Sequence, residues 1–235
     1  GLNKYDGYSV KIFKNTLEED LLTSNRVRDI EEDKKGNLWI GTDAGITIRN
    51  CSTDTFKKIY SEKINNTGIS GPVIRKIIVN KDANSILCIS ERKGLFIFNE
   101  NYELEKRIKM PFTLISAGVS LYDGVKIDKN NFVFASSRGL VHYNDITGNF
   151  DFVLRNKTNG IITTNSICTV NKNTLLVTLK SGVGFVSFKK DKSNKLKFKL
   201  KSVQLLDYEF KNARVDYKNN LWLAHLHKGI SVIQS

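Results

Sequence analysis

The chain has 235 residues, of which 40% are hydrophobic and 26% charged, with only two prolines and no Gly/Ser-rich run. This composition is that of a folded domain and excludes an internal flexible linker, and no apolar run reaches the roughly 18–20 residues of a membrane-spanning helix. Lysine and arginine total 37 against 24 aspartate and glutamate, a net charge of +13, which favours acidic partners but also arises from lysine-rich composition alone.

The chain begins with two strand signals in GLNKYDGYSVKIF, which read as the outer pair of a sheet whose inner strands would precede residue 1. A polar connector follows, with Leu17, Leu21 and Leu22 as candidate anchors, so residues 1–25 are interpreted as a partial repeat. Next come four strand signals, NRVRDIEED, LWIGT, ITIRN and TFKKIY, separated by turns rich in Gly, Asn and Asp.

This four-strand pattern recurs along the rest of the chain. We place the repeats at approximately residues 26–60, 72–108, 121–155, 165–203 and 213–235. A turn glycine before the third strand marks each repeat: Gly45, Gly94, Gly139, Gly184 and Gly229. The first two glycines are 49 residues apart, and each later one follows the glycine before it by 45 residues. A period in the forties with several strands per unit is the signature of β-propeller blades. We therefore predict an all-β chain that forms a single β-propeller segment of four-stranded antiparallel blades, cut from a larger ring.

The second strand of each repeat is almost wholly apolar, as expected for blades packed between neighbours on both faces. Trp39 and Trp222 occupy the same repeat position and are expected to fill the space between adjacent blades. Cys88 stands in that position in the second repeat and reads as a small buried hydrophobic residue.

The turns between the second and third strands should all emerge on one face, together with the connections between blades. Four of the five turns carry a cation, and Arg26 in a connection joins them, which predicts a basic rim suited to an anionic ligand. The candidate ligand-binding residues are Arg26, Arg92, Lys93, Arg138, Lys180, His227 and Lys228. Charged, solvated turn tips would give the same pattern without a ligand.

The sequence offers no positive sign of catalysis. His225 and His227 could share a face, but no third ligand or carboxylate lies nearby, and Cys51, Cys88 and Cys168 lack CxxC spacing. We therefore predict no catalytic residue, no metal and no cofactor. Nucleic acid is not an expected partner, because aromatic residues do not interleave with the basic rim.

Two phrases carry a family resemblance. Residues Ile30 to Ile46 read I-x-E-D-x-x-G-N-L-W-I-G-T-x-x-G-I, which resembles the two-component regulator propeller repeat, and residues 1–8 resemble its G-L-N-R-Y-D-G-Y phrase. The match is partial at residues 215–233, through the phrase at residues 217–223, and the middle three repeats lack the Trp and the Gly-Thr pair. The resemblance implies a seven-bladed ring in the periplasmic sensor half of a hybrid histidine kinase, part of an inner-membrane protein whose membrane segment lies outside these residues.

The resemblance further implies a domain that senses oligosaccharides from glycan breakdown and signals through a homodimeric receptor. An acidic oligosaccharide would fit the basic rim. Two alternatives stay open: a dimerisation or interaction scaffold with the ligand site elsewhere, and a propeller enzyme that acts on acidic polysaccharide with His225 or His227.

Overall fold

The computed structural model describes residues 1–16, 21–60, 63–64, 68–69, 71–154, 163–180, 182–192, 195–205 and 209–234. Leu17 lies outside the described residues. The chain divides into two compact units, Gly1–Met110 and Pro111–Ser235, called here the N-terminal and C-terminal units. Strands make up nearly all the regular structure, and the prediction of an all-β propeller built from antiparallel four-stranded blades is confirmed.

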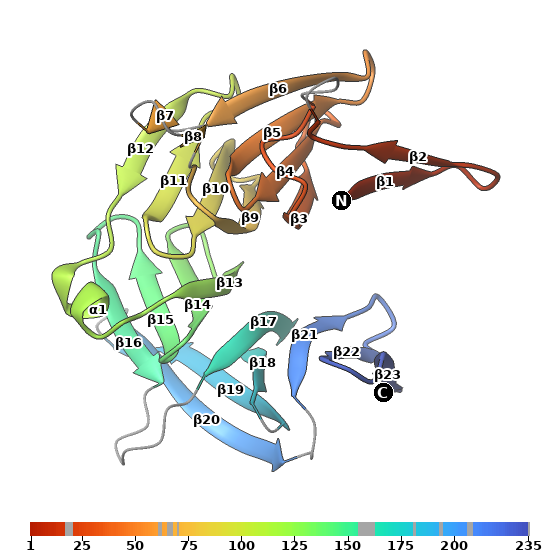
Figure 1. Cartoon of the computed structure of the whole chain (residues 1–235). Coiled ribbons are helices and arrows are strands. Elements are labelled where there is room, and N and C mark those ends of the chain that lie inside the picture. The colour runs from red at the N-terminus through yellow and green to blue at the C-terminus, as the bar shows by residue number, and fades with distance from the viewer. Residues whose placement is uncertain are drawn as a thin grey trace. The chain divides into compact units, whose positions relative to one another are not determined.

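The N-terminal unit contains two complete blades and two smaller strand pairs (Figure 1). The first blade has the order β3-β4-β5-β6 and the second the order β9-β10-β11-β12, each following the chain. Strands β1 and β2 form a hairpin before the first blade, and the short pair β7 and β8 lies between the blades in sequence. The bounds are β1 Leu2–Tyr5, β2 Val10–Phe13, β3 Val27–Glu32, β4 Leu38–Thr42, β5 Gly45–Asn50, β6 Thr55–Tyr60, β7 Lys63–Ile64, β8 Gly68–Ile69, β9 Ile74–Asn80, β10 Ser85–Ser90, β11 Gly94–Phe98 and β12 Leu104–Ile108.

The C-terminal unit contains two four-stranded blades and a three-stranded sheet, in the orders β13-β14-β15-β16, β17-β18-β19-β20 and β21-β22-β23 (Figure 1). A short helix, α1 (Phe112–Ser116), precedes them and was not predicted. It follows Pro111, whose fixed φ suits a helix start. The strand bounds are β13 Leu121–Lys126, β14 Asn131–Ser136, β15 Gly139–Asn144, β16 Phe150–Leu154, β17 Thr164–Asn171, β18 Thr174–Leu179, β19 Gly182–Lys190, β20 Leu196–Leu205, β21 Phe210–Val215, β22 Leu221–His225 and β23 Ile230–Ile233.

Trp39 fills the space between the two blades of the N-terminal unit, as predicted. Its side chain is 0% exposed and shares a core cluster with Ile74 and Phe98 of the second blade. The indole nitrogen donates to Asp33 Oδ2 at 3.1 Å, so the polar atom of this buried ring has a partner. Cys88 lies in the same cluster and is fully buried, which confirms its expected role.

Trp222 differs from its repeat equivalent in its surroundings. Trp39 packs against the blade that follows its own, whereas the described residues hold no blade after the sheet of Trp222, so the packing of Trp222 between blades stays a prediction. Its side chain lies in the three-stranded sheet and is 43% exposed, although its indole nitrogen makes the equivalent bond to Asp216 at 3.0 Å. The core of that sheet lies on the side of the preceding blade, around Phe210 and Leu223. Trp222 is outside that cluster, so its local turn is repeated but its burial is not.

Turn glycines stand at the first residue of the third strand or just before it, as predicted for four of five positions. Gly45, Gly94, Gly139 and Gly229 all have positive φ, a conformation that side chains other than glycine rarely adopt. In the fourth blade the prediction of Gly184 is wrong by two residues. Gly182 has a φ of 148° and pairs with Leu179 across the turn, whereas Gly184 lies inside β19 opposite Val177. The sequence Gly-Val-Gly contains two glycines that could begin the third strand, and the structure uses the first, Gly182.

Replacement of Gly94 by alanine is expected to destabilise the N-terminal unit strongly. The residue has a φ of 94°, and a Cβ there would lie 2.0 Å from the carbonyl oxygen of Ile108. Backbone strain alone costs about 1–3 kcal/mol, and the clash adds to it. Urea denaturation of Gly94→Ala should show this loss, while Gly148→Ala, with positive φ but open space, should show strain alone. Equal losses would contradict the close contact with Ile108.

The N-terminal hairpin is attached to the first blade by packing and charge. Phe13 packs against Phe56 with ring centroids 5.3 Å apart, and Arg49 lies over the Phe13 ring. Asp54 pairs with both Lys11, at 2.8 Å, and Arg49, at 2.7 Å. The ion pairs therefore link β2 to the edge of the blade.

The attachment should weaken in acid. Hydrogen bonds from Lys11 and then Arg49 lower the pKa of Asp54 from 3.8 to about 2. Because the folded-state pKa lies below the unfolded one, the stabilisation is present above about pH 4 and is lost as pH falls toward 2. The stability difference between wild type and Asp54→Asn, measured by denaturation from pH 6 to pH 2, should shrink over that window. A constant difference would contradict the assignment.

Candidate functional site

The turns between the second and third strands lie beside the connections that enter each blade. A backbone N–H in the turn donates to the carbonyl of a residue before or at the start of the first strand in four blades: Asp43 to Arg26, Glu91 to Val73, Ser137 to Ser120 and Leu226 to Glu209. Within each of these blades, the two kinds of loop thus share one face. We call the side chains of these loops the rim of each unit.

The rim of the N-terminal unit is less basic than predicted, because carboxylates alternate with the cations. Arg28 donates two bonds to Asp43, at 2.5 and 2.8 Å. Arg75 is held likewise by Glu91, with Nε 2.8 Å from Oε2. The hydrogen bond from Arg28 is the largest cause that lowers the pKa of Asp43. The prediction counted turn cations and missed both partner arginines, which lie on the first strands.

Three predicted ligand-binding residues lie on this rim. Arg92 and Lys93 are exposed at the tip of the turn between β10 and β11, and the Lys93 backbone N–H donates to Ser90. Arg26 is also exposed, with one nitrogen 3.4 Å from Asp43. The N-terminal rim therefore presents exposed cations beside two arginine–carboxylate pairs that are fixed in place.

The other four predicted residues lie in the C-terminal unit. Arg138 is exposed in the turn between β14 and β15, and its backbone N–H donates to the Ser136 hydroxyl at 3.1 Å. Lys180, His227 and Lys228 are exposed in the turns of the next two blades. Glu209 lies on the same rim and is paired with Lys211 at 2.6 Å, so a carboxylate accompanies the cations here too.

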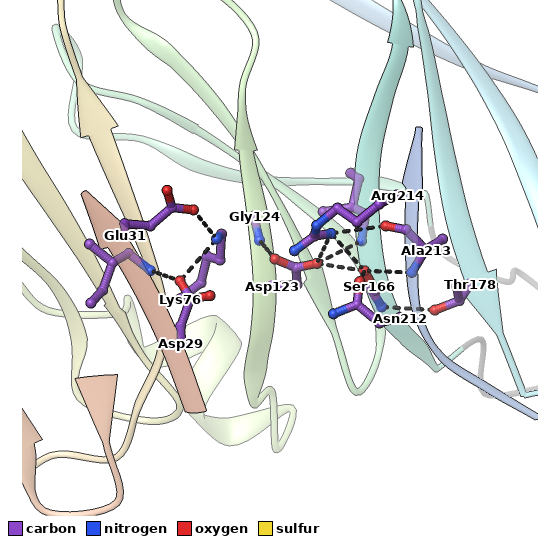
Figure 2. Close-up of polar contacts among 12 residues, drawn as sticks. Asp29, Glu31, Lys76, Asp123, Gly124, Ser166, Thr178, Asn212, Ala213 and Arg214 are labelled. Carbon is purple, nitrogen blue, oxygen red and sulfur yellow. Dashed lines mark hydrogen bonds and ion pairs between the residues drawn. The ribbon is translucent and has the colours of Figure 1, made fainter. Parts of the chain in front are cut away.

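A polar cluster that the prediction missed joins the first strands of the two N-terminal blades (Figure 2). Asp29 on β3 accepts bonds from Lys76 Nζ at 2.9 Å and from the Ile77 backbone N–H at 2.8 Å, both on β9. Glu31 accepts a second bond from Lys76, whose side chain is only 11% exposed. Burial alone lowers the pKa of Lys76, but these two carboxylates outweigh it and raise the pKa above its usual value.

A similar cluster joins first strands in the C-terminal unit (Figure 2). Asp123 on β13, 8% exposed, accepts bonds from the Ser166 hydroxyl at 2.6 Å and from the Ile167 backbone N–H at 3.1 Å, both on β17. Ser166 also contacts Asn212 on β21, and Arg214 of that strand lies 3.4 Å from Asp123. In both units, an aspartate on one blade accepts a backbone N–H and a side-chain donor from the next blade.

These clusters are structural links, because their buried atoms are satisfied within the chain. A signal for them exists in the sequence: a polar residue stands at the third position of the first strand in every blade, opposite a residue near the end of the second strand. The positions are Asp29, Lys76, Asp123, Ser166 and Asn212.

A small cavity lies on another part of the N-terminal unit, where the turn after β3 meets the turn after β9. It is lined by residues that include Asp33, Lys34, Lys35, Asn84 and Tyr102. The Lys34 ammonium donates a hydrogen bond to the Lys81 carbonyl at 2.5 Å, and the Lys35 ammonium donates one to the Glu100 carbonyl at 2.6 Å. These lysines therefore connect the two blades.

The described residues contain no cluster of three or more His, Cys, Asp or Glu side chains that could hold a metal. His225 Nε2 lies 2.6 Å from the Ser231 hydroxyl, with its ring 4.6 Å from that of Phe210, while His227 is exposed in the turn. The two imidazoles are thus in different surroundings. No helix in the described ranges is long and apolar enough to cross a membrane.

Comparison with known proteins agrees with this architecture. Residues 21–44 match the family described as Two component regulator propeller. The matched residues include most of the phrase at Ile30 to Ile46. The chain is therefore a β-propeller that carries a two-component regulator repeat. No curated protein matches it.

Several solved structures share the fold. The extracellular domain assigned to the hybrid two-component system BT4673 of B. thetaiotaomicron is 17% identical over 99% of this chain and 35% of its own, with a TM-score of 0.62. The corresponding domain of BT3049 from the same organism is 17% identical over 91% of this chain and 34% of its own, with a TM-score of 0.59. A streptogramin B lyase is 13% identical over 89% of this chain and 65% of its own, with a TM-score of 0.63.

At these identities the similarity shows the fold alone. The chain spans between 27% and 35% of the length of the B. thetaiotaomicron domains that it matches.

Proposed function

We propose that these residues form part of the extracytoplasmic, ligand-sensing domain of a hybrid two-component sensor. The observation that carries the proposal is the regulator-propeller repeat at residues 21–44, on a fold shared with extracellular domains of such systems. In this proposal the segment is not itself an enzyme. The full-length protein carries the kinase, crosses the inner membrane through another segment, and places these residues in the periplasm.

The proposed ligand is an oligosaccharide from glycan breakdown that bears acidic groups and binds at the rim. Support comes from the exposed cations Arg26, Arg92 and Lys93 beside the pairs of Arg28 with Asp43 and Arg75 with Glu91. Arginine can hold a carboxylate or sulfate through two parallel bonds. The fixed carboxylates could accept bonds from sugar hydroxyls, so a mixed rim suits a charged sugar better than a uniformly basic surface would.

Signalling would follow from a change in the geometry of a receptor homodimer when the ligand binds. The test is autophosphorylation of the full-length protein in membrane vesicles, with and without uronic acid and sulfated oligosaccharides. We expect one acidic sugar to change the rate of autophosphorylation. The double variant Arg92→Ala with Lys93→Ala should reduce this change, whereas Lys57→Ala, on the outer strand β6, should leave it as in the wild type.

Phosphorylation that no sugar affects, in a protein that still dimerises, would favour the scaffold function instead. Cleavage of acidic polysaccharide that is lost in His225→Ala would favour an enzyme.

A further inference from the structure

The fourth blade ends in a lysine-rich hairpin that the proposed function does not use. Strands β19 and β20 pair from Gly182 with Leu205 to Lys190 with Leu196, beyond the point where β18 begins at Thr174. Lysines recur at alternate positions on β20 and before its start, with one more on β19. We call this set the lysine ladder: Lys189, Lys195, Lys197, Lys199 and Lys201, all exposed.

The two sides of the hairpin differ in chemistry. Leu196, Phe198 and Leu200 belong to or pack against the core cluster between the third and fourth blades. Lys190, opposite Leu196, is paired with Asp128 at 3.0 Å. Lys195, Lys197 and Lys199 alternate with these packed residues and therefore point away from the core, and Lys201 is the unpaired residue of a β-bulge between Leu200 and Ser202.

The ladder keeps like charges close together. Lys189 lies directly opposite Lys197 in the antiparallel register, and Lys199 is the next residue on the same face of β20. Like charges directly opposite on a sheet are destabilising. Asp191 lies 3.7 Å from Lys197 and is the carboxylate that the ladder contacts among the described residues. One carboxylate leaves an excess of positive charge that a bound anion would neutralise.

The ladder also follows the edge strand of its sheet. Among the described strands, β20 is the last of this sheet, so alternate backbone N–H groups point away from β19 beside the lysines. Lysines two residues apart on a strand are spaced by about 7 Å, so Lys195 to Lys199 spans about 13 Å. Lysine on an edge strand also prevents pairing with another chain, but that effect does not explain the opposed pair of Lys189 and Lys197.

We propose that the lysine ladder binds a linear polyanion that carries sulfate or carboxylate groups. A narrow row of cations along one strand matches an extended anionic chain better than the flat surface of a bilayer. It also lacks the exposed rings on which nucleic-acid bases stack, because Phe198 packs against the core. This surface is separate from the rim, and the proposal stands without a ligand there.

The test uses a fluorescent heparin dodecasaccharide as the sulfated probe, with binding followed by anisotropy at 50 and 200 mM NaCl. Lys197→Glu with Lys199→Glu should weaken binding about tenfold or more at the lower salt and flatten the salt dependence, since fewer counterions are released. The control is Lys57→Glu with Lys109→Glu, which makes the same charge change at two exposed lysines of the N-terminal unit. The control should bind within about threefold of the wild type, a small change for distant charges in salt.

Equal losses in the two double variants would overturn the proposal, because they would assign binding to net charge. Absence of heparin binding by the wild type would overturn it too. Tighter binding to anionic lipid vesicles or to a single-stranded oligonucleotide, lost in the ladder variant, would assign the surface to those partners instead. Thermal melting of each variant confirms that it is folded.

Discussion

Replacement of Trp39 by alanine should lower the free energy of unfolding of the N-terminal unit by about 3–5 kcal/mol. The indole is fully buried between two blades, beside Phe98 and Tyr102 at centroid distances of 5.4 and 5.7 Å. Its removal leaves a cavity lined by both blades and frees a carboxylate oxygen of Asp33 from its indole bond. Urea denaturation followed by far-UV circular dichroism measures the loss without relying on the removed fluorophore.

Trp222→Ala is the matched control. It removes the same side chain and the same kind of bond to an aspartate, but from a position that is 43% exposed. The expected cost is below about 2 kcal/mol, because less apolar surface returns to water. Equal costs at the two positions would show that the local turn, rather than burial between blades, determines the contribution of the tryptophan.

Replacement of Asp29 by alanine should be similarly severe, at about 3–5 kcal/mol, because it removes one partner of a buried ion pair. Lys76 would keep Glu31 as its only partner in this cluster, and the Ile77 N–H would lose its acceptor. Both groups come from the neighbouring blade, so the loss acts on the contact between blades. Chemical denaturation measures it, with Glu32→Ala, at an exposed carboxylate on the same strand, as the control.

A double variant separates the charge from the packing. Asp29→Ala combined with Lys76→Met removes the buried carboxylate and the buried ammonium. It should recover part of the lost stability because no buried charge is left with a partner missing, while the Ile77 N–H still lacks its acceptor. Losses that simply add in the double variant would show that the two side chains stabilise the unit independently.

The strands could be predicted from the sequence because every blade repeats the same pattern of apolar second strand and glycine turn. Apolar second strands such as LWIGT and SILCIS are buried, and the glycine turns occur where positive φ is required. The error in the fourth blade has a local cause, because Gly182 and Gly184 are two candidate glycines for one turn. At Trp222 the side chain and its bond to Asp216 repeat, and the described residues hold no following blade that would cover the ring as the second blade covers Trp39.

The candidate site was less accessible, because it depends on which side chains meet in space. The rim residues Arg92 and Arg138 lie in exposed turns, as expected from their position in the repeat. The carboxylate pairs of Arg28 and Arg75 could not be read from the turns alone, since each arginine lies on the first strand and its partner follows 15 or 16 residues later, after the second strand. The link from Asp29 to Lys76 spans two blades and is visible only after the blades are packed.

The proposed sensing function is tested most directly by isothermal titration of the full-length protein with acidic and neutral oligosaccharides at two salt concentrations. We expect one acidic oligosaccharide to bind, more weakly at higher salt, and Arg92→Ala to reduce its affinity by about tenfold, as for loss of a charge-assisted bond. Lys57→Ala should leave the affinity unchanged. Absence of binding by every sugar, or binding that neither salt nor Arg92→Ala affects, would contradict a sensor whose ligand binds at this rim.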